Sequence, residues 1–403
     1  MRVLLVVHGY PPEASGGTEV YTRELARALR RAGDEVAVLA RVADPSRPDR
    51  VLRREEREGL ALFAINNTFR SCRSFEETWR DDAIRSLAAA TLEEWRPDVV
   101  HVQHLTGLSA DLAGETRERG IPSVVTLNDY WLICQRGQLL DLDLQRCDGP
   151  HPRGCARCLH TSRRQAERRT RGVAAIFESA THFLAPSKTL RERFLAHGLD
   201  PGRVTLHEQG IDPARYGVAE GRPGSRLRVG FVGSLMVSKA PHLLLEAFGR
   251  LPEDEARLDV FGGHAAYHGD DRYRGRLEPL LRGPGVRWHG ALEHAAIPSA
   301  LASLDVLVVP SVWLENAPFV IKEAFAAGLP VVASDLGGMA ELVTHERDGL
   351  LFPAGDAAGL EAALRRLLDE PGLLDRLRSG VPRVPSIDDD AARTRALYER
   401  LRS

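Results

Sequence analysis

Residues 306–333 read VLVVPSVWLENAPFVIKEAFAAGLPVVA. The runs 306–309 and 331–333 are apolar, rich in valine and of the length of a buried strand. A helix-length segment lies between them, and Pro318 suits its first turn, where the N–H that proline lacks is not missed. The order strand, helix, strand predicts a parallel sheet wrapped by helices.

The same alternation extends over nearly the whole chain and forms two series. Strand-length apolar runs in the first half are 3–7, 36–39, 60–65, 99–102, 123–127, 183–185 and 204–206. Those in the second half are 227–232, 258–261, 286–288, 306–309, 331–333 and 350–352. We therefore expect an α/β protein with two Rossmann-like, doubly wound domains, which would face a central cleft at the carboxyl ends of their strands.

The expected boundaries follow from composition. The amino-terminal domain takes residues 1–208 and holds a cysteine-rich insertion at about 130–172. The segment 209–226 is rich in glycine and proline and is interpreted as a linker. A second domain is assigned to 227–386, and a terminal helix at 387–403 is expected to pack back toward the first domain.

Composition also limits the functional classes. The 403 residues are 43% apolar, and the formal net charge is −2, so no global field attracts nucleic acid. No stretch approaches the roughly 20 apolar residues of a membrane span. The opening strand is too short for a signal peptide, so we expect a cytoplasmic protein with reduced cysteines.

Two carboxylates flank the start of the helix in the opening stretch. Glu315 lies in the loop before the helix, and Glu323 lies about one and a half turns inside it. The helix start offers free N–H groups and the positive end of the helix dipole, which suit a phosphate. The two carboxylates are therefore placed to accept hydrogen bonds from different parts of one ligand.

Glu315 and Glu323, with seven residues between them, resemble the E-x7-E motif of the retaining glycosyltransferase family four, whose members have the GT-B fold. The resemblance implies that a sugar passes from a nucleoside diphosphate sugar to a hydroxyl acceptor, which is a glycan, a lipid-linked compound or a small molecule. It implies that Glu323 binds the ribose, that Glu315 lies by the transferred sugar, and that no cofactor takes part in catalysis. The donor would also contact the helix start, at Ala317, Pro318, Phe319 and Val320.

Other loops of the second half resemble the donor site of this family. After the run 227–232 come Gly233, Ser234 and Lys239, which are expected to meet the diphosphate through backbone N–H groups and an ammonium. Ser234 stands where the family often has arginine, so the diphosphate would depend more on Lys239. Gly262 and Gly290, each after a strand, resemble the nucleobase pocket, and residues 334–341 (SDLGGMAE) resemble the family's Gly-Gly loop.

The first half supplies the candidate acceptor side. Gly16 and Gly17 resemble the family's flexible loop, and their backbone can approach a ligand closely. His104 follows the strand 99–102 and is interpreted either as a catalytic group or as a hydrogen-bonded core histidine. Asn128 stands where many members of the family have a histidine that contacts the sugar, and it is a candidate catalytic residue that can still form a hydrogen bond there. Asp129 beside it is the candidate substitute for a proton-carrying group.

Four cysteines in the predicted insertion suggest a structural zinc site. Cys134, Cys147, Cys155 and Cys158 have the spacing C-x12-C-x7-C-x2-C, and four thiolates would close a zinc shell. The alternative is a set of buried thiols without metal. The five arginines that follow are interpreted as a solvated helix face or as a peripheral contact with anionic lipid at the inner face of the membrane: Arg163, Arg164, Arg168, Arg169 and Arg171.

Two other functions stay open at this point. A nucleotide-sugar 2-epimerase shares the fold, and a non-catalytic nucleotide-sugar-binding protein is compatible with Ser234 and Asn128. The sequence specifies neither the sugar and base of the donor, nor the acceptor, nor the oligomeric state.

Overall fold

The computed structural model describes residues 1–217 and 226–402, so the second half of the predicted linker, 218–225, lies outside the described residues. The chain divides into two compact units. Unit 1 contains Met1–Gly210 and Pro385–Ser403, and unit 2 contains Ile211–Val384. Both are α/β units with a largely parallel central sheet, which confirms the predicted fold class.

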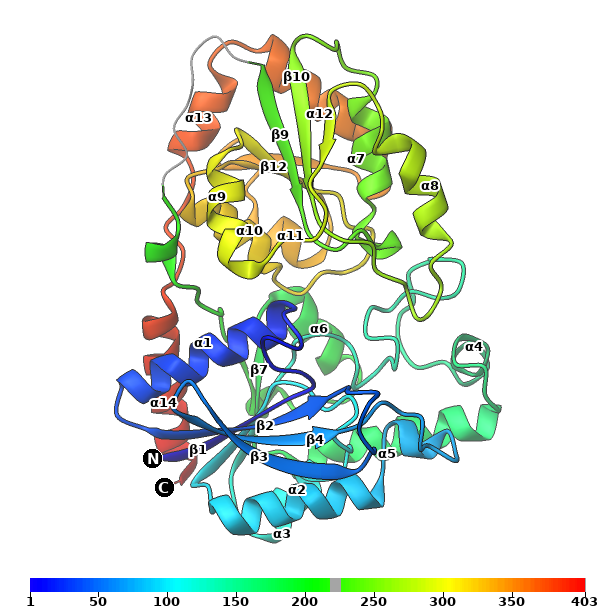
Figure 1. The fold of residues 1–403 in the computed structure, drawn as a ribbon, viewed down its shortest axis with the longest axis vertical. Coiled ribbons are helices and arrows are strands. Elements are labelled where there is room, and N and C mark those ends of the chain that lie inside the picture. Colours follow the sequence, from blue (N-terminus) through cyan, green and yellow to red (C-terminus); the bar gives the residue numbers. More distant parts are fainter. Residues whose placement is uncertain (218–225, 403) are drawn as a thin grey trace. The chain divides into compact units, whose positions relative to one another are not determined.

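Unit 1 is built on an eight-stranded sheet in the order β3-β4-β2-β1-β5-β6-β7-β8. Its strands are β1 (Arg2–Val7), β2 (Glu35–Val42), β3 (Val51–Arg57), β4 (Leu60–Asn66), β5 (Val99–Val102), β6 (Ser123–Thr126), β7 (His182–Ala185) and β8 (Val204–Leu206). Its α-helices are α1 (Gly17–Arg31), α2 (Asp82–Trp95), α3 (Leu112–Glu118), α4 (Pro152–Cys158), α5 (Arg163–Ser179), α6 (Lys188–Leu195) and α14 (Ile387–Arg402). In Figure 1, α1 lies on one side of strands β1–β4, and α2 and α3 lie on the other.

The sequence pattern explains why β1 and α1 form. Every residue from Val3 to Val7 is buried, because β1 is a central parallel strand covered on both faces. Helix α1 buries Tyr21, Leu25 and Leu29, which recur at helical spacing and face the sheet.

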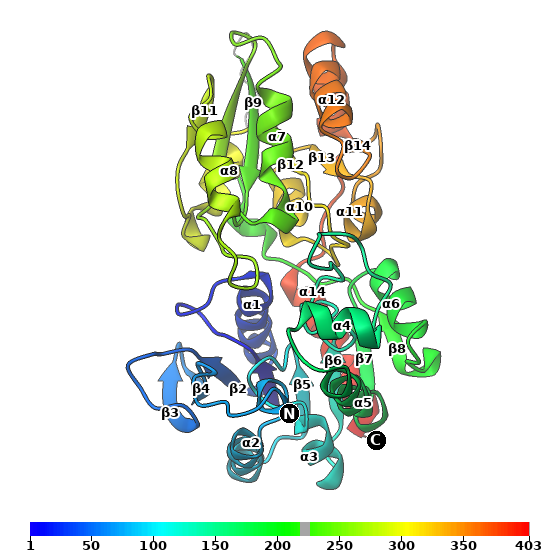
Figure 2. The same ribbon diagram turned by 90° about the vertical axis from the view of Figure 1, so that its right-hand side faces the viewer.

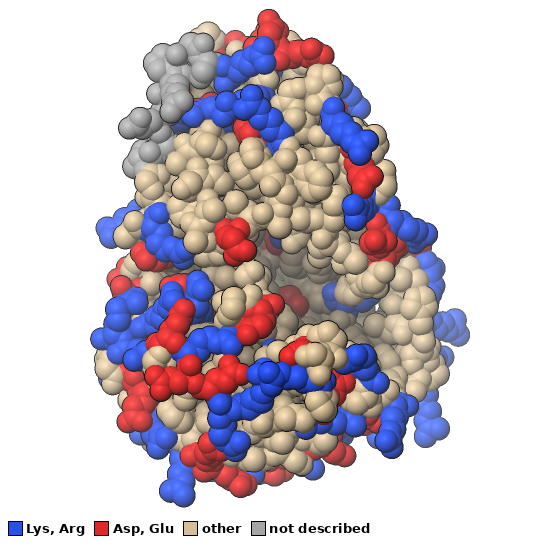
Figure 3. Space-filling view, in the orientation of Figure 1, with Lys and Arg blue, Asp and Glu red and all other residues tan. Residues whose placement is uncertain are grey.

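Strand β3 was absent from the sequence prediction. It reads VLRREER, pairs antiparallel with β4 and forms the edge of the sheet. Its charged side chains form ion pairs, such as Arg57 with Glu13 and Arg53 with Glu55. Figure 3 shows basic and acidic side chains intermixed over this part of unit 1. Charges on an edge strand oppose pairing with another chain, and the same charges conceal the strand from a search for apolar runs.

The terminal helix α14 packs against α1 within unit 1 (Figure 1). Asp390 is fully buried there and accepts hydrogen bonds from Tyr21 Oη at 2.9 Å and from the Gly210 N–H at 2.8 Å. Its other oxygen lies 2.5 Å from His207 Nε2. One carboxylate therefore joins α1, α14 and the segment that follows β8.

Unit 2 contains a six-stranded parallel sheet in the order β11-β10-β9-β12-β13-β14. Its strands are β9 (Leu227–Val232), β10 (Ala256–Phe261), β11 (Val286–Trp288), β12 (Val306–Val309), β13 (Val331–Ser334) and β14 (Gly349–Phe352). Its α-helices are α7 (Pro241–Phe248), α8 (Tyr273–Leu280), α9 (Ile297–Ala302), α10 (Phe319–Ala326), α11 (Gly337–Leu342), α12 (Ala357–Asp369) and α13 (Leu373–Ser379). Helix α7 contacts α8 and α12 (Figure 2), whereas α10 contacts α9 and α11 (Figure 1).

Within each unit the candidate site residues follow the carboxyl ends of neighbouring strands. In unit 1 these are the ends of β1, β5 and β6, and in unit 2 they are the ends of β9, β10, β11 and β12. Across residues 1–217 and 226–402, no helix combines the length and apolar character needed to cross a membrane.

Candidate functional site

The two predicted carboxylates flank helix α10 as expected. Glu315 lies in the loop after β12, and Glu323 is the fifth residue of α10, which begins directly after Pro318. Both residues are buried, with 2% of Glu315 and 7% of Glu323 exposed. Ionised carboxylates at this depth require hydrogen-bonding partners, and each has them.

Glu315 is paired with Lys239, which lies 76 residues earlier in the chain. Lys239 Nζ donates to Glu315 Oε1 across 2.5 Å, and Ser311 Oγ donates to the same oxygen across 2.8 Å. The Lys239 ammonium also lies 5.7 Å from the centroid of the Trp313 ring. The side chain of Lys239 is 30% exposed, so this cation is accessible while its carboxylate partner is not.

Glu323 is held by residues that the sequence did not single out. Tyr216 Oη donates to Glu323 Oε1 across 3.0 Å, and His294 Nε2 lies 3.6 Å from the same oxygen. Burial and the neighbouring carboxylate raise the pKa of the Tyr216 hydroxyl, which therefore stays a donor. Tyr216 falls in the segment interpreted as a linker, where no periodic pattern marks a site.

Three of the predicted donor glycines are brought together at the ends of β9, β10 and β11. The Gly262 N–H donates to the Gly290 carbonyl across 2.7 Å. A Cβ on Gly262 would lie 1.8 Å from the Gly233 carbonyl oxygen. The backbone at this edge is therefore closely packed, and Ser234 beside it is exposed.

The Gly-Gly segment at the start of α11 packs against the Glu315 loop. The Gly338 N–H donates to the Glu315 carbonyl across 2.7 Å. A Cβ on Gly338 would lie 1.7 Å from the Asn316 carbonyl oxygen, so no larger residue fits without moving that loop. The segment thus positions Glu315 through its backbone.

In unit 1, His104 and Asp129 form a hydrogen-bonded pair. His104 Nε2 lies 3.1 Å from Asp129 Oδ2, and His104 Nδ1 accepts the Thr106 N–H across 3.1 Å. Because Nδ1 is an acceptor, the proton of the neutral ring is on Nε2 and points to the carboxylate. Asp129 is thus the partner of His104, and these hydrogen bonds are compatible with both interpretations of His104, the catalytic group and the hydrogen-bonded core histidine.

His8, at the end of β1, extends this pair along the sheet edge. Its ring centroid lies 4.2 Å from that of His104, and its Nε2 lies 3.3 Å from Glu19 Oε1. Burial, with further contributions from His104 and Arg41, holds the pKa of His8 well below its usual value. Glu19 lies under the predicted flexible loop, because a Cβ on Gly16 would be 2.6 Å from Glu19 Oε2. Gly16 and Gly17 themselves are exposed.

Asn128 is turned into the protein. Its side chain is buried, and Nδ2 donates to both the carbonyl and the Oε1 of Gln103, each at 3.0 Å. Gln209 Nε2 donates to Asn128 Oδ1 across 2.9 Å. This arrangement favours a structural role for the amide, which differs from the expected contact with a sugar.

The structure does not support the predicted zinc site. Among the described residues, no group of three or more His, Cys, Asp or Glu side chains is arranged to hold a metal ion. Cys134, Cys147, Cys155 and Cys158 are free thiols and partly buried. Burial raises the pKa of Cys134 and of Cys158. The alternative of thiols without metal fits these observations.

The arginine-rich helix α5 is less uniformly exposed than expected. Arg169 is 3% exposed, and its Nη2 donates to the Trp131 carbonyl across 2.6 Å. Arg163 and Arg168 form ion pairs with Glu167 and Glu76. Contact with an anionic membrane stays a prediction.

Comparison with known proteins agrees with the geometry. A family model described as Glycosyltransferase Family 4 matches residues 15–215, and one described as Glycosyl transferases group 1 matches residues 226–370. A D-inositol 3-phosphate glycosyltransferase of Kineococcus radiotolerans is 28% identical over 395 residues, which span 89% of this chain and 83% of the relative. A glycogen synthase of Mycobacterium tuberculosis is 27% identical over 383 residues, which span 93% of this chain and 88% of the relative.

Solved structures share the fold. Sucrose-phosphate synthase from Thermosynechococcus elongatus superposes with a TM-score of 0.75 at 22% identity, covering 100% of this chain and 99% of the other. The Anabaena protein HepE, solved in complex with UDP and glucose, superposes with a TM-score of 0.73 at 18% identity and covers 99% of this chain and 100% of its own.

Proposed function

We propose that this chain, which belongs to the glycosyltransferases of family 4 and group 1, transfers a sugar from a nucleoside diphosphate sugar to a hydroxyl acceptor with retention of the anomeric configuration. The observation that carries the proposal is the cluster of Lys239, Glu315 and Glu323 around the start of α10. The donor class is supported by relatives whose structures were solved with UDP or UDP-glucose.

Each member of the cluster has a proposed task. The Glu323 carboxylate accepts hydrogen bonds from the ribose hydroxyls, and the buried Glu315 accepts from the transferred sugar. The diphosphate binds at the start of α10, where the first N–H groups of a helix have no acceptor within the helix. The ammonium of Lys239 then exchanges part of its contact with Glu315 for the phosphate oxygens.

The reaction itself is proposed to proceed on one face of the sugar. The acceptor oxygen bonds to the anomeric carbon from the side on which the diphosphate leaves. The bond from that carbon to the phosphate oxygen breaks, its electron pair stays with the diphosphate, and the acceptor proton passes to a departing phosphate oxygen. Lys239 and the helix-start N–H groups stabilise the negative charge that develops on the leaving group.

On the acceptor side we propose His104 and Asp129 as the groups that orient the attacking hydroxyl. Asp129 fixes the ring of His104 by accepting from Nε2. The relatives act on different acceptors by name, an inositol phosphate and glycogen, and as part of the proposal we place the choice of acceptor in unit 1 of this chain.

The test is a panel of nucleoside diphosphate sugars. A true donor raises the melting temperature of the protein, because a ligand that binds the folded state stabilises it. With that donor and candidate acceptors, NMR of the product reports the anomeric configuration. An inverted product would contradict retention, and an epimerised donor formed without acceptor would show an epimerase instead.

A further inference from the structure

Arg41 lies near the end of β2 and is held in place by three neighbours. Its Nε donates to the Asn67 carbonyl across 2.7 Å, and its guanidinium carbon lies 4.8 Å from the centroid of the Phe69 ring. Gly107, with φ of 73°, leaves room for the side chain, since a Cβ there would be 2.5 Å from Arg41 Cδ. Asn67 Nδ2 donates to the Gly107 carbonyl and joins these contacts.

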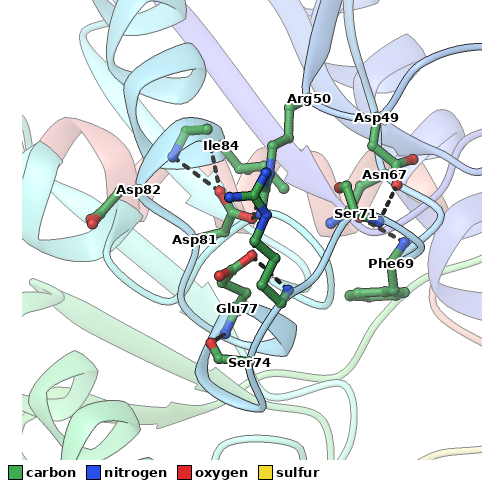
Figure 4. A network of polar contacts seen from close by, with 12 residues as sticks. Asp49, Arg50, Asn67, Phe69, Ser71, Ser74, Glu77, Asp81, Asp82 and Ile84 are labelled. Carbon is green, nitrogen blue, oxygen red and sulfur yellow. Dashed lines mark hydrogen bonds and ion pairs between the residues drawn. The ribbon is translucent and has the colours of Figure 1, made fainter.

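None of these contacts neutralises the charge of Arg41. Within the part of the chain that the structure describes, the ion pairs do not include this guanidinium. Asp49, whose charge acts on Arg41, accepts hydrogen bonds from the Thr68 N–H at 2.7 Å and from the Ser71 N–H at 3.1 Å. Figure 4 shows Asp49 beside Ser71, with Asn67 and Phe69 close by.

Arg50, which follows Asp49, provides a contrast. Its guanidinium lies between Glu77 and Asp81, and its Nη2 donates to Asp81 Oδ2 across 2.7 Å (Figure 4). Among the described residues, two carboxylates thus pair with one arginine and none with the other. Burial lowers the pKa of Arg41, and Asp49 offsets part of that effect. A partly buried cation that forms no ion pair is less favourable in the free protein than a paired one and suits an anionic ligand.

Arg41 belongs to the same sheet edge as the candidate acceptor residues. Strand β2 pairs with β1, Val7 is level with Ala40, and His8 follows directly. The charge of Arg41 contributes to the lowered pKa of His8. The ring of His8 contacts the ring of His104, which is hydrogen-bonded to Asp129. The groups follow one another along the edge in the order Arg41, His8, His104, Asp129.

We propose that the acceptor carries an oxyanion, a phosphate or a carboxylate, and that Arg41 binds it through Nη1 and Nη2. That this oxyanion belongs to the sugar acceptor rests on the proposed function. That Arg41 forms an oxyanion site rests only on the contacts of Arg41. The two terminal nitrogens of arginine match two oxygens of such a group. The contacts of Arg41 with Asn67, Gly107 and the ring of Phe69 fix the direction of these nitrogens.

The experiment titrates inorganic phosphate, and separately acetate, into the full chain at constant ionic strength. Lys239→Ala is the parent, since it weakens phosphate binding at the proposed donor site. Arg41→Gln is introduced into this parent. In a second variant Arg41→Lys keeps the positive charge but lacks the two terminal nitrogens of the guanidinium. The matched control is Arg70→Gln, because Arg70 is an exposed cation of the same region whose Nη2 donates to the Pro45 carbonyl.

We expect Arg41→Gln to weaken oxyanion binding by about tenfold or more, Arg41→Lys to weaken it less, and Arg70→Gln to leave it nearly unchanged. The ratio of phosphate to acetate affinity tells the two acceptor classes apart. Equal affinity of parent and Arg41→Gln, an equal loss in Arg70→Gln, or no binding by the parent would each overturn the proposal. Melting temperatures equal to that of the Lys239→Ala parent verify that the added substitutions leave the fold intact.

Nucleotide binding separates this inference from the proposed function. A wild-type chain that nucleoside diphosphates do not stabilise contradicts the proposed function. A chain that they do stabilise, but whose oxyanion affinity is independent of Arg41, contradicts only the present inference.

Discussion

Lys239 Nζ and Glu315 Oε1 are 2.5 Å apart, and the Glu315 side chain is 3% exposed while the Lys239 side chain is 30% exposed. The pair links the segment after β9 to the loop before α10, two parts of unit 2 that lie 76 residues apart. A buried carboxylate that loses its cation is strongly destabilised, whereas the cation, being accessible, can also serve a ligand.

For Lys239→Ala we expect turnover to fall by about a hundredfold or more, because the leaving diphosphate loses a fixed positive charge. The melting temperature without ligand should fall as well, since Glu315 loses its partner. Steady-state kinetics and thermal denaturation measure the two effects. In a double-mutant cycle with Glu315→Gln, additive losses would show that the pair does not act as a unit.

Glu323→Gln should weaken nucleotide binding by about tenfold to a hundredfold, because the ribose hydroxyls lose a charged acceptor. Tyr216→Phe removes the donor 3.0 Å from Glu323 Oε1, so it should lower thermal stability while nucleotide affinity changes by about threefold or less. Isothermal titration calorimetry with the nucleoside diphosphate checks both. If Tyr216→Phe weakened binding as much as Glu323→Gln, the tyrosine would itself belong to the binding site.

Gly338→Ala should destabilise the protein by about 1–3 kcal/mol and weaken donor binding, since the new methyl group would meet the backbone of Asn316 and displace the Glu315 loop. Gly275→Ala is the matched control, because Gly275 lies in α8 and a Cβ there would have nothing within 4 Å, so alanine should be neutral or stabilising. Urea denaturation compares the two variants. Equal stabilities would contradict the close approach at Gly338.

Asp129→Ala should lower kcat by about tenfold to a thousandfold without changing nucleotide affinity, because it releases the ring of His104 in unit 1 and leaves unit 2 intact. His104→Gln should produce a loss of similar size. Turnover with a true acceptor measures the loss of kcat, and nucleotide titration measures whether the nucleotide affinity is unchanged. A parallel loss of nucleotide affinity would show that the pair serves the donor and not the acceptor.

Asp390→Asn tests the acid stability of unit 1. Burial alone would raise the pKa of Asp390, but the hydrogen bonds from His207, the Gly210 N–H and Tyr21 outweigh it and hold the pKa below its usual value. Because the folded pKa is depressed, the carboxylate stabilises the fold above the ordinary pKa of about 3.9, and this stabilisation is lost as the pH falls through the folded value. At pH near 7 the variant should therefore be less stable by about 3 kcal/mol, and the difference should shrink toward acid pH.

The control for that measurement is Asp388→Asn. Asp388 is on the same helix, and its exposed ion pair with Arg31 should contribute less than about 1 kcal/mol. If the stability difference between Asp390→Asn and the wild type stayed constant down to acid pH, the lowered pKa of Asp390 would be contradicted.

Much of the fold could be predicted because its signals are local. The predicted strand runs form β1, β2 and every strand from β4 to β14. The helix predicted after Pro318 begins directly after that proline. Strand β3 escaped prediction because an edge strand carries charges where a central strand carries valine. The cysteine spacing indicated zinc, but in the part of the chain that the structure describes no such side chains are arranged to hold a metal ion, because spacing along the chain does not fix how the thiols are oriented in space.

By itself the sequence determined the two α/β units and the positions of Glu315, Glu323 and the glycine turns, since strand length, helical period and turn chemistry act over a few residues. Only the tertiary structure decided the partners: Lys239 for Glu315, Tyr216 for Glu323, Asp129 for His104, and, within the described ranges, no carboxylate for Arg41. These relationships join strand ends that are distant in sequence, and which side chains meet there depends on the order of strands in the sheet and on burial, which no local pattern encodes.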